Sequence, residues 1–201
     1  FDTPLLVGLF GNLLSPGRSL FFYSPPLILA LFAFRGFLKE RPWEAMLFGS
    51  VTAIYILFYS VYGDWKGGWC WGPRFLVPVI PFLILPIGNL LARKGWRLAL
   101  AMLFSVGVGV QILGWSVNYS YVYWDWERMG LSPKTAFLWV PDISAIPLHL
   151  QNLLAGRHLD LWLVWVYENQ GSTVLLMTLV PPLLLLMLAL MLFSRRGRRI
   201  G

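Results

Sequence analysis

The twelve residues GDWKGGWCWGPR, at positions 63–74, combine side chains suited to binding a phosphate and a sugar. Their four glycines allow positive φ angles and a close approach of the backbone to a ligand. Lys66 and Arg74 bring positive charge, and the planar guanidinium of arginine matches the oxygens of a phosphate. The aromatic side chains of the loop, which offer flat faces to sugar rings or acyl chains, are Trp65, Trp69 and Trp71. This composition favours a ligand with a phosphate, a sugar and a lipid tail. Membrane anchoring is the competing interpretation, because Trp, Gly and Arg are common at membrane interfaces.

A second stretch of similar character is LLSPGRSLFFYSPP, residues 13–26. Its SPG sequence predicts a tight turn that aims Arg18 at the same surface as the loop. Pro25 and Pro26 follow, and they leave carbonyls that other protein groups or water must satisfy. A broken helix of this kind is typical of the cavities of transporters and lipid-handling enzymes. Ordinary kinked packing is an equally good interpretation.

The composition places both motifs in an integral membrane protein. The 201 residues are 58% hydrophobic and 12% charged, with a mean hydropathy of +0.67. Soluble domains are roughly 45–50% apolar and about 25% charged. The net charge of +7 comes from short clusters beside apolar segments, which is the pattern of membrane orientation signals. Nucleic acid is therefore excluded as a partner, and membrane lipid is expected.

Five apolar segments are long enough to cross a membrane, which takes about 20 residues. They are residues 19–38, 45–62, 75–92, 98–117 and 172–193. The apolar segment at 4–14 is too short to span and predicts an interfacial or re-entrant piece. Because the sequence shows no repeat and no linker, the expected fold is a single all-α transmembrane domain over residues 1–201.

The cations predict the orientation of these segments. Ten of the sixteen lie in two short turns and the C-terminal tail: Arg35, Lys39, Arg41, Arg93, Lys94, Arg97, Arg195, Arg196, Arg198 and Arg199. Lys and Arg concentrate on the cytoplasmic side of membrane proteins, so the C-terminus is expected there and the loop at 63–74 outside. The long segment 118–171 is then an outer loop. Its apolar residues at helical spacing, which predict an amphipathic helix on the outer surface, are Ile146, Leu150, Leu153 and Leu154.

Together, SPGRSLFFYSPP and WKGGWCWGPRFLVPVIPFLILP resemble the C-terminal membrane region of bacterial GT-C glycosyltransferases. These are the glycosyltransferase-39-like, polyprenyl-phosphate-sugar-dependent enzymes related to protein O-mannosyltransferases and lipid A aminoarabinose transferases. The resemblance covers residues 4–92, and the two motifs in this order are more specific than either alone. It implies a multi-pass protein of the bacterial cytoplasmic (inner) membrane. Such a protein transfers a sugar from a polyprenyl-phosphate carrier to an acceptor at the outer face.

The resemblance also implies site residues. Arg18 matches the SPGR position and Arg74 the GPR position, so both are candidate contacts of the carrier phosphate. The other candidates for binding the lipid-linked sugar are Lys66, Trp65, Trp69 and Trp71. The catalytic carboxylate of the family lies in a first outer loop that is not in this sequence, so no catalytic residue is assigned. That carboxylate often acts with a divalent metal, but no cofactor or metal site is evident here.

Two further expectations follow. The chain is interpreted as the C-terminal part of a longer protein, and the alternative function is a non-catalytic transmembrane subunit of a larger membrane complex. In that alternative, partner helices pack on small-residue faces such as Gly107 and Gly109. His149 and His158 are too far apart for a typical zinc pair and are expected to be polar residues on a surface helix.

Overall fold

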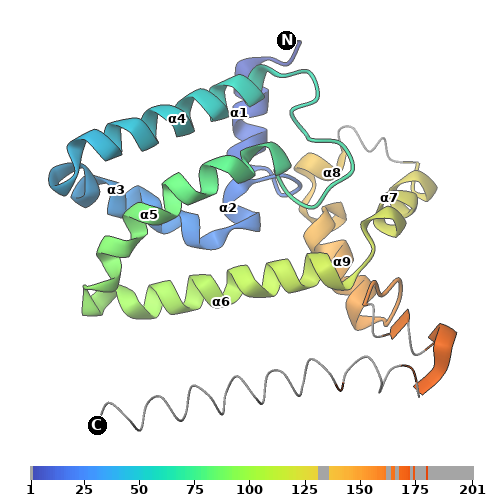
Figure 1. Ribbon diagram of the computed structural model, residues 1–201. Coiled ribbons are helices and arrows are strands. Elements are labelled where there is room, and N and C mark those ends of the chain that lie inside the picture. The colour runs from blue at the N-terminus through green and yellow to red at the C-terminus, as the bar shows by residue number, and fades with distance from the viewer. Residues whose placement is uncertain are drawn as a thin grey trace, which may run out of the picture. The chain divides into compact units, whose positions relative to one another are not determined.

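A computed structural model describes residues 2–130, 136–161, 164–165, 168–172, 174 and 180, and the regular elements in these residues are all helices (Figure 1). The chain divides into two compact units, residues 1–158 and residues 159–201. Every element discussed below belongs to the first unit. That both units form a single membrane domain stays a prediction.

The first unit is built from nine α-helices and three short 3-10 helices within the described residues. In chain order they are α1 (Leu5–Leu14), α2 (Leu20–Tyr23), η1 (Pro25–Leu27), α3 (Ile28–Glu40), α4 (Pro42–Val61), η2 (Arg74–Val79), α5 (Ile80–Leu91), α6 (Lys94–Ser116), α7 (Tyr119–Arg128), α8 (Ala136–Trp139), η3 (Pro141–Ile143) and α9 (Ala145–Leu154). The apolar segment at 4–14 forms the short helix α1, and its interfacial or re-entrant position stays a prediction.

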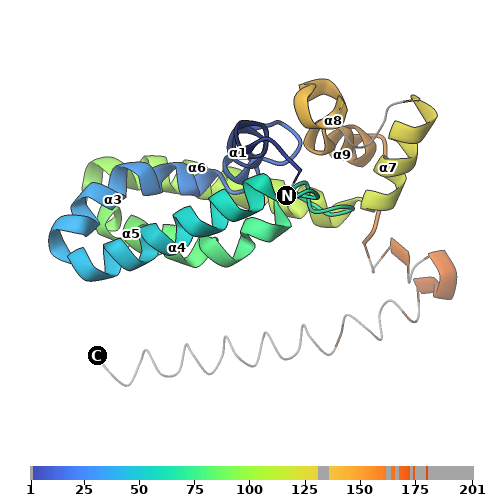
Figure 2. The ribbon, with the colours of Figure 1, turned by 90° about the horizontal axis from the view of Figure 1, so that it is seen from above.

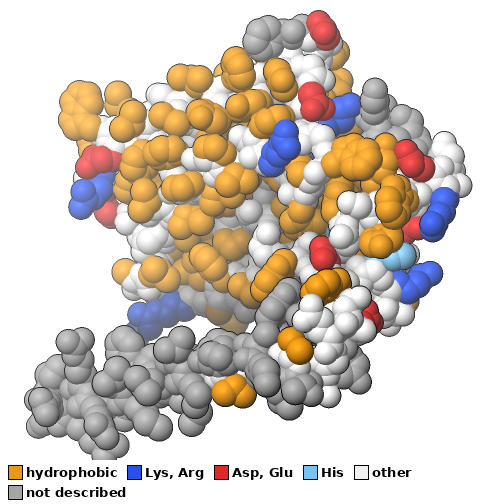
Figure 3. All heavy atoms as spheres, turned by 45° about the vertical axis from the view of Figure 1, so that its right-hand side comes forward, with side chains coloured by type: hydrophobic (Ala, Val, Ile, Leu, Met, Phe, Trp, Pro, Cys, Tyr) orange, Lys and Arg blue, Asp and Glu red, His pale blue; other side chains and the backbone are white. Residues whose placement is uncertain are grey.

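Three of these helical segments are long and apolar enough to cross a membrane: Pro42–Val61, Arg74–Leu91 and Lys94–Ser116. They confirm, within a few residues, helices of spanning length at the positions of the predicted second, third and fourth spans. The predicted fifth span, 172–193, lies almost wholly outside the described residues. Hydrophobic side chains cover much of the surface of the molecule (Figure 3), as expected for helices that face lipid.

The predicted first span, 19–38, is not one continuous helix. It is divided into α2, η1 and α3, and α3 alone has only 13 residues. The break falls at Pro25 and Pro26, because proline supplies no backbone N–H and clashes with the preceding turn of a helix. The prolines therefore turn the expected span into a kinked segment.

The four longest helices lie side by side, with α3 packed on α4 and α5, and α5 packed on α6 (Figures 1 and 2). The α3–α4 and α5–α6 turns meet at one end of this bundle, called here the turn end. At the other end, called the loop end, α7, α8 and α9 pack against the loop at 63–74 (Figure 2). The helices thus place the two sequence motifs at the loop end.

Candidate functional site

Arg18 joins the two sequence motifs in space. Its side chain is buried, with 1% of its surface exposed. The guanidinium donates hydrogen bonds to the carbonyls of Gly68 at 2.6 Å, Gly72 at 3.3 Å and Cys70. A fourth bond, of 3.1 Å, goes to the phenol oxygen of Tyr119. Arginine suits this task because its rigid fork presents several donors at once.

The charge of Arg18 is balanced by dipoles and rings rather than by a carboxylate. No acidic side chain in the described ranges pairs with it, and its guanidinium carbon lies 5.5 Å from the ring centre of Phe137 and 5.8 Å from that of Tyr119. Carbonyl oxygens and aromatic faces both stabilise a buried cation. Its bonds go to the protein itself, so the structure supports a positioning role for Arg18. Contact with a carrier phosphate stays a prediction.

The residues before Arg18 form the tight turn that the sequence predicts. The Ser15 hydroxyl donates to the carbonyl of Gly11 at 2.7 Å and accepts from the backbone N–H of Arg18 at 3.1 Å. At Gly17 the chain presses on α8, where a Cβ would come within 2.5 Å of the carbonyl oxygen of Phe137. Only glycine allows that approach. The SPG sequence therefore fixes the direction in which Arg18 leaves the backbone.

The loop itself depends on three glycines with positive φ. Gly67, Gly68 and Gly72 have φ angles of +77°, +67° and +70°, a region that side chains disfavour. At Gly72 a Cβ would also lie 2.8 Å from the ring of Tyr23. These turns bring the loop carbonyls to the guanidinium of Arg18.

The three tryptophans of the loop occupy different environments. Trp65 is buried against Gly11 in a hydrophobic cluster that includes Val122 and Trp126 of α7. Trp71 is half-buried and packs edge-on to Tyr23, with ring centres 5.0 Å apart. Trp69 has 61% of its surface exposed. Its ring stacks on that of Tyr123, with ring centres 3.6 Å apart, and of the three it is the most exposed.

Two of the candidate cations lie nearer the surface than Arg18. Arg74 begins η2 and is exposed, with its guanidinium carbon 5.0 Å from the ring centre of Phe75 and with no guanidinium hydrogen bond to the described part of the chain. Lys66 is half-buried. Arg74 is therefore the cation of the loop whose donors are open to a ligand.

His149 is a functional candidate that sequence reasoning missed, because the expectation of a surface residue is wrong. The ring is fully buried, its Nδ1 lies 2.8 Å from the carbonyl oxygen of Ala145, and its Nε2 has no partner in the described residues. Its ring centre lies 4.5 Å from that of Trp71 and 5.8 Å from that of Tyr119. Burial lowers the pKa of His149 to about 4, so the imidazole is neutral at pH 7. A lone histidine on an apolar helix carries no sequence signal that separates burial from exposure.

The predicted amphipathic helix is present as α9, and it packs on the protein through one side. The residues that it buries are Ala145, Leu148, His149 and Asn152. Leu150 and Leu154 of the predicted apolar stripe are exposed. They remain available to a membrane surface, and that contact stays a prediction.

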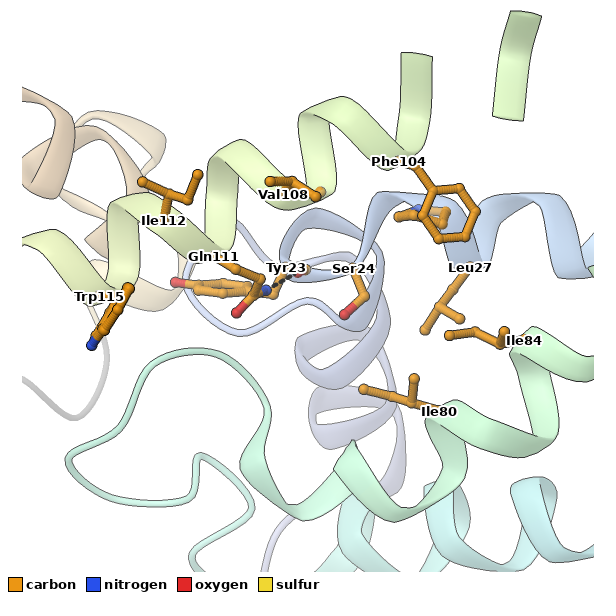
Figure 4. Close-up of a pocket in the computed structure, with 12 residues that line it drawn as sticks. Tyr23, Ser24, Leu27, Ile80, Ile84, Phe104, Val108, Gln111, Ile112 and Trp115 are labelled. Atoms are coloured by element: carbon orange, nitrogen blue, oxygen red, sulfur yellow. Dashed lines mark hydrogen bonds between the residues drawn. The ribbon is translucent and has the colours of Figure 1, made fainter. Parts of the chain in front are cut away.

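An apolar groove runs beside α6, next to the loop end (Figure 4). Its volume is about 480 Å³, and its lining residues include Leu27 of η1, Ile84 of α5, and Val108 and Ile112 of α6. The Nε2 of Gln111 donates to the carbonyl oxygen of Tyr23 at 2.7 Å. This contact supports the expectation that the proline pair leaves a carbonyl that another group must satisfy.

Comparisons of the chain with protein-family models, curated proteins and solved structures give no match. In the described ranges no three side chains of His, Cys, Asp or Glu come together as a metal site. The geometry itself offers one organised loop with an exposed arginine, beside one apolar groove.

Proposed function

We propose that the chain is part of a membrane glycosyltransferase that takes a sugar from a polyprenyl-phosphate carrier at the outer face of a bacterial inner membrane. The observation that carries the proposal is the position of Tyr23 between the loop and the groove. Its phenol donates to the carbonyl of Gly17 at 3.1 Å, its ring contacts Gly72, and it lines the groove. A cationic loop joined to an apolar groove suits a ligand with a phosphate head and a hydrocarbon tail.

In this proposal the groove holds part of the isoprenoid tail and Arg74 binds the carrier phosphate. Transfer of the sugar breaks its bond to that phosphate and leaves negative charge on the phosphate oxygens. A guanidinium placed there stabilises the charge as it develops. Trp69 offers a face to the sugar, and Arg18 holds the loop. Asp64, the acid within the motif, is exposed and is not assigned as the base.

The first test is the binding of a polyprenyl phosphate to the purified protein in detergent. We expect Arg74→Gln to weaken binding roughly tenfold or more, since a hydrogen bond to a charged group contributes about 1.5–3 kcal/mol. Arg128→Gln is the matched control, because Arg128 is an exposed arginine that pairs with Asp125 in α7. Equal binding by Arg74→Gln and the control would contradict the assignment of Arg74.

The proposal that the groove holds the isoprenoid tail is tested with a larger side chain in the groove. Ile112→Trp places a larger ring in the groove and should weaken binding of the long polyprenyl phosphate while sparing a phosphate with a single isoprene unit. The control is Val106→Trp, since Val106 is an exposed residue of α6 that does not line the groove. If Ile112→Trp binds the long carrier as the wild type does, the groove does not hold the tail.

The alternative function, a non-catalytic subunit of a larger membrane complex, is supported by Gly109. A Cβ at Gly109 would meet nothing within 4 Å, whereas one at Gly107 would lie 3.1 Å from Pro26. Of the two expected packing positions, Gly109 is therefore the one still open to a partner helix. Co-purification with another membrane protein in fixed stoichiometry, lost in Gly109→Leu, would favour this function.

A further inference from the structure

A second cavity lies at the turn end, the opposite end of the helical bundle from the two sequence motifs. It has a volume of about 480 Å³ and is formed where the C-terminal half of α3 meets the end of α5. Three cations line it: Arg35 and Lys39 from α3, and Arg93 from the α5–α6 turn. The fold thus brings Arg93 into one cavity with two cations that lie more than fifty positions earlier in the sequence.

These three cations are exposed and available to a ligand. None of them has an ion pair or side-chain hydrogen bond to another described residue. Of the neighbouring carboxylates, Glu44 lies 3.4 Å from Arg41, and Glu40 accepts a 3.0 Å hydrogen bond from Asn89, itself a residue of the cavity wall. Three like charges around one cavity repel one another, and an anion between them would relieve that repulsion.

The remaining wall of the cavity is mostly apolar. Its apolar side chains are those of Phe32, Ala33, Leu38 and Leu90, and Asn89 adds a polar one. Gly36 adds space, since a Cβ there would meet only the guanidinium of Arg93, at 3.9 Å. A ligand that fills the cavity therefore carries both an anionic group and an apolar part. A small free anion would leave the apolar wall uncovered.

The cavity also lies at the ends of the helical segments that are long and apolar enough to cross a membrane. Lys39 precedes the spanning segment Pro42–Val61, and Arg93 lies between Arg74–Leu91 and Lys94–Ser116. Basic pockets between helices at a membrane surface bind anionic headgroups. We propose that this cavity binds one anionic phospholipid, with its phosphate on Arg35, Lys39 and Arg93 and the start of an acyl chain on the apolar wall.

The test is native mass spectrometry of the full chain with phosphatidylglycerol and phosphatidylcholine in competition. The wild type should retain one phosphatidylglycerol with at least tenfold preference. The pocket variant Arg35→Gln/Lys39→Gln/Arg93→Gln should lose that preference, since each cation near a lipid surface contributes roughly fivefold. The matched control is Arg41→Gln/Lys94→Gln/Arg97→Gln, which removes the same charge at the same end outside the cavity lining.

A second pair of variants separates the cavity from the charge. Gly36→Leu fills the space and keeps all three cations, so it should lose the lipid, whereas Gly36→Ala should keep it. Equal losses in the pocket and control triples, or full retention by Gly36→Leu, would overturn the proposal. Displacement of the lipid by millimolar glycerol phosphate would show a site for small phosphates and would overturn it too. If the triple variant of the three cavity cations does not fold, the comparison of Gly36→Leu with Gly36→Ala tests the proposal.

Discussion

Arg18 at the loop end and the three cations around the cavity at the turn end use positive charge in opposite ways. At the loop end, Arg18 is buried and its two terminal guanidinium nitrogens donate to three carbonyls and a phenol of the protein. At the turn end, Arg35, Lys39 and Arg93 are exposed around a cavity. The comparison indicates that an arginine in a sequence motif is available to a ligand only where the fold leaves its guanidinium without protein hydrogen bonds. Whether a cationic side chain stabilises the fold or remains available to a partner depends on its burial and its hydrogen bonds.

Arg18→Gln should have the largest effect on stability, because it removes the buried cation of the loop end. The variant leaves loop carbonyls without their donor, and each unsatisfied buried group costs about 1–3 kcal/mol. We expect the free energy of unfolding, measured by denaturant titration in detergent micelles, to fall by ~3 kcal/mol or more. Arg74→Gln is the control and should change it by less than about 0.5 kcal/mol, because Arg74 is exposed. Similar effects of the two variants would remove the distinction between the buried and the exposed arginine.

Gly72→Ala should have the next largest effect. Its Cβ would demand an unfavourable positive φ and would press on the ring of Tyr23, so we expect a loss of about 2 kcal/mol in the same titration. Gly88→Ala in α5 is the matched control. Its Cβ meets nothing within 4 Å, and alanine should stabilise the helix by about 0.5–1 kcal/mol. Loss of stability in both variants would contradict the specific role of Gly72.

His149 makes the loop end sensitive to acid. Its pKa falls from the ordinary 6.5 to about 4 in the folded protein, so below pH 6.5 the unfolded chain binds a proton that the folded one excludes. Stability is therefore full above pH 6.5 and is lost as the pH falls toward 4. Between pH 7 and pH 5 we expect the free energy of unfolding to drop by roughly 1–2 kcal/mol. His149→Gln should flatten this slope, and an equal slope in the variant would assign the sensitivity to other groups.

The smallest effect is expected at the turn end. Arg93→Gln should leave the free energy of unfolding within about 0.5 kcal/mol of the wild type in neutral detergent, since Arg93 is exposed and holds no other described side chain. Titrations of both proteins in the same micelles measure the difference. A loss comparable to that of Arg18→Gln would mean that the turn end also needs its cations to fold.

Much of the fold follows from hydropathy alone. The spans at 45–62, 75–92 and 98–117 are present within a few residues, because a long apolar run has few structural alternatives in a membrane. The expected span at 19–38 differs because the proline pair breaks it. Hydropathy is averaged over a stretch of sequence, and this average does not reveal that Pro25 and Pro26 lack backbone N–H donors.

The site was only partly predictable. Both motifs were visible as unusual combinations, and the freed carbonyl behind Pro25 and Pro26 could be expected from proline chemistry. The hydrogen bonds of Arg18 could not, because they join residues fifty positions and more apart. The burial of His149 likewise depends on how α9 packs on Trp71. Sequence patterns report residue types, whereas the partner of each donor is set by the tertiary fold.

Hydrogen exchange of the loop amides tests the central claim most directly, namely that Arg18 holds the loop at 63–74 as one unit with the SPGR turn. The amide of Trp65 donates to the carbonyl of Tyr62, just before the loop, and that of Gly67 to the carbonyl of Asp64, so both should be protected in the wild type. In Arg18→Gln they should exchange much faster, while protection within α4 and α6 is unchanged. Unaltered protection of the loop in Arg18→Gln would contradict the claim.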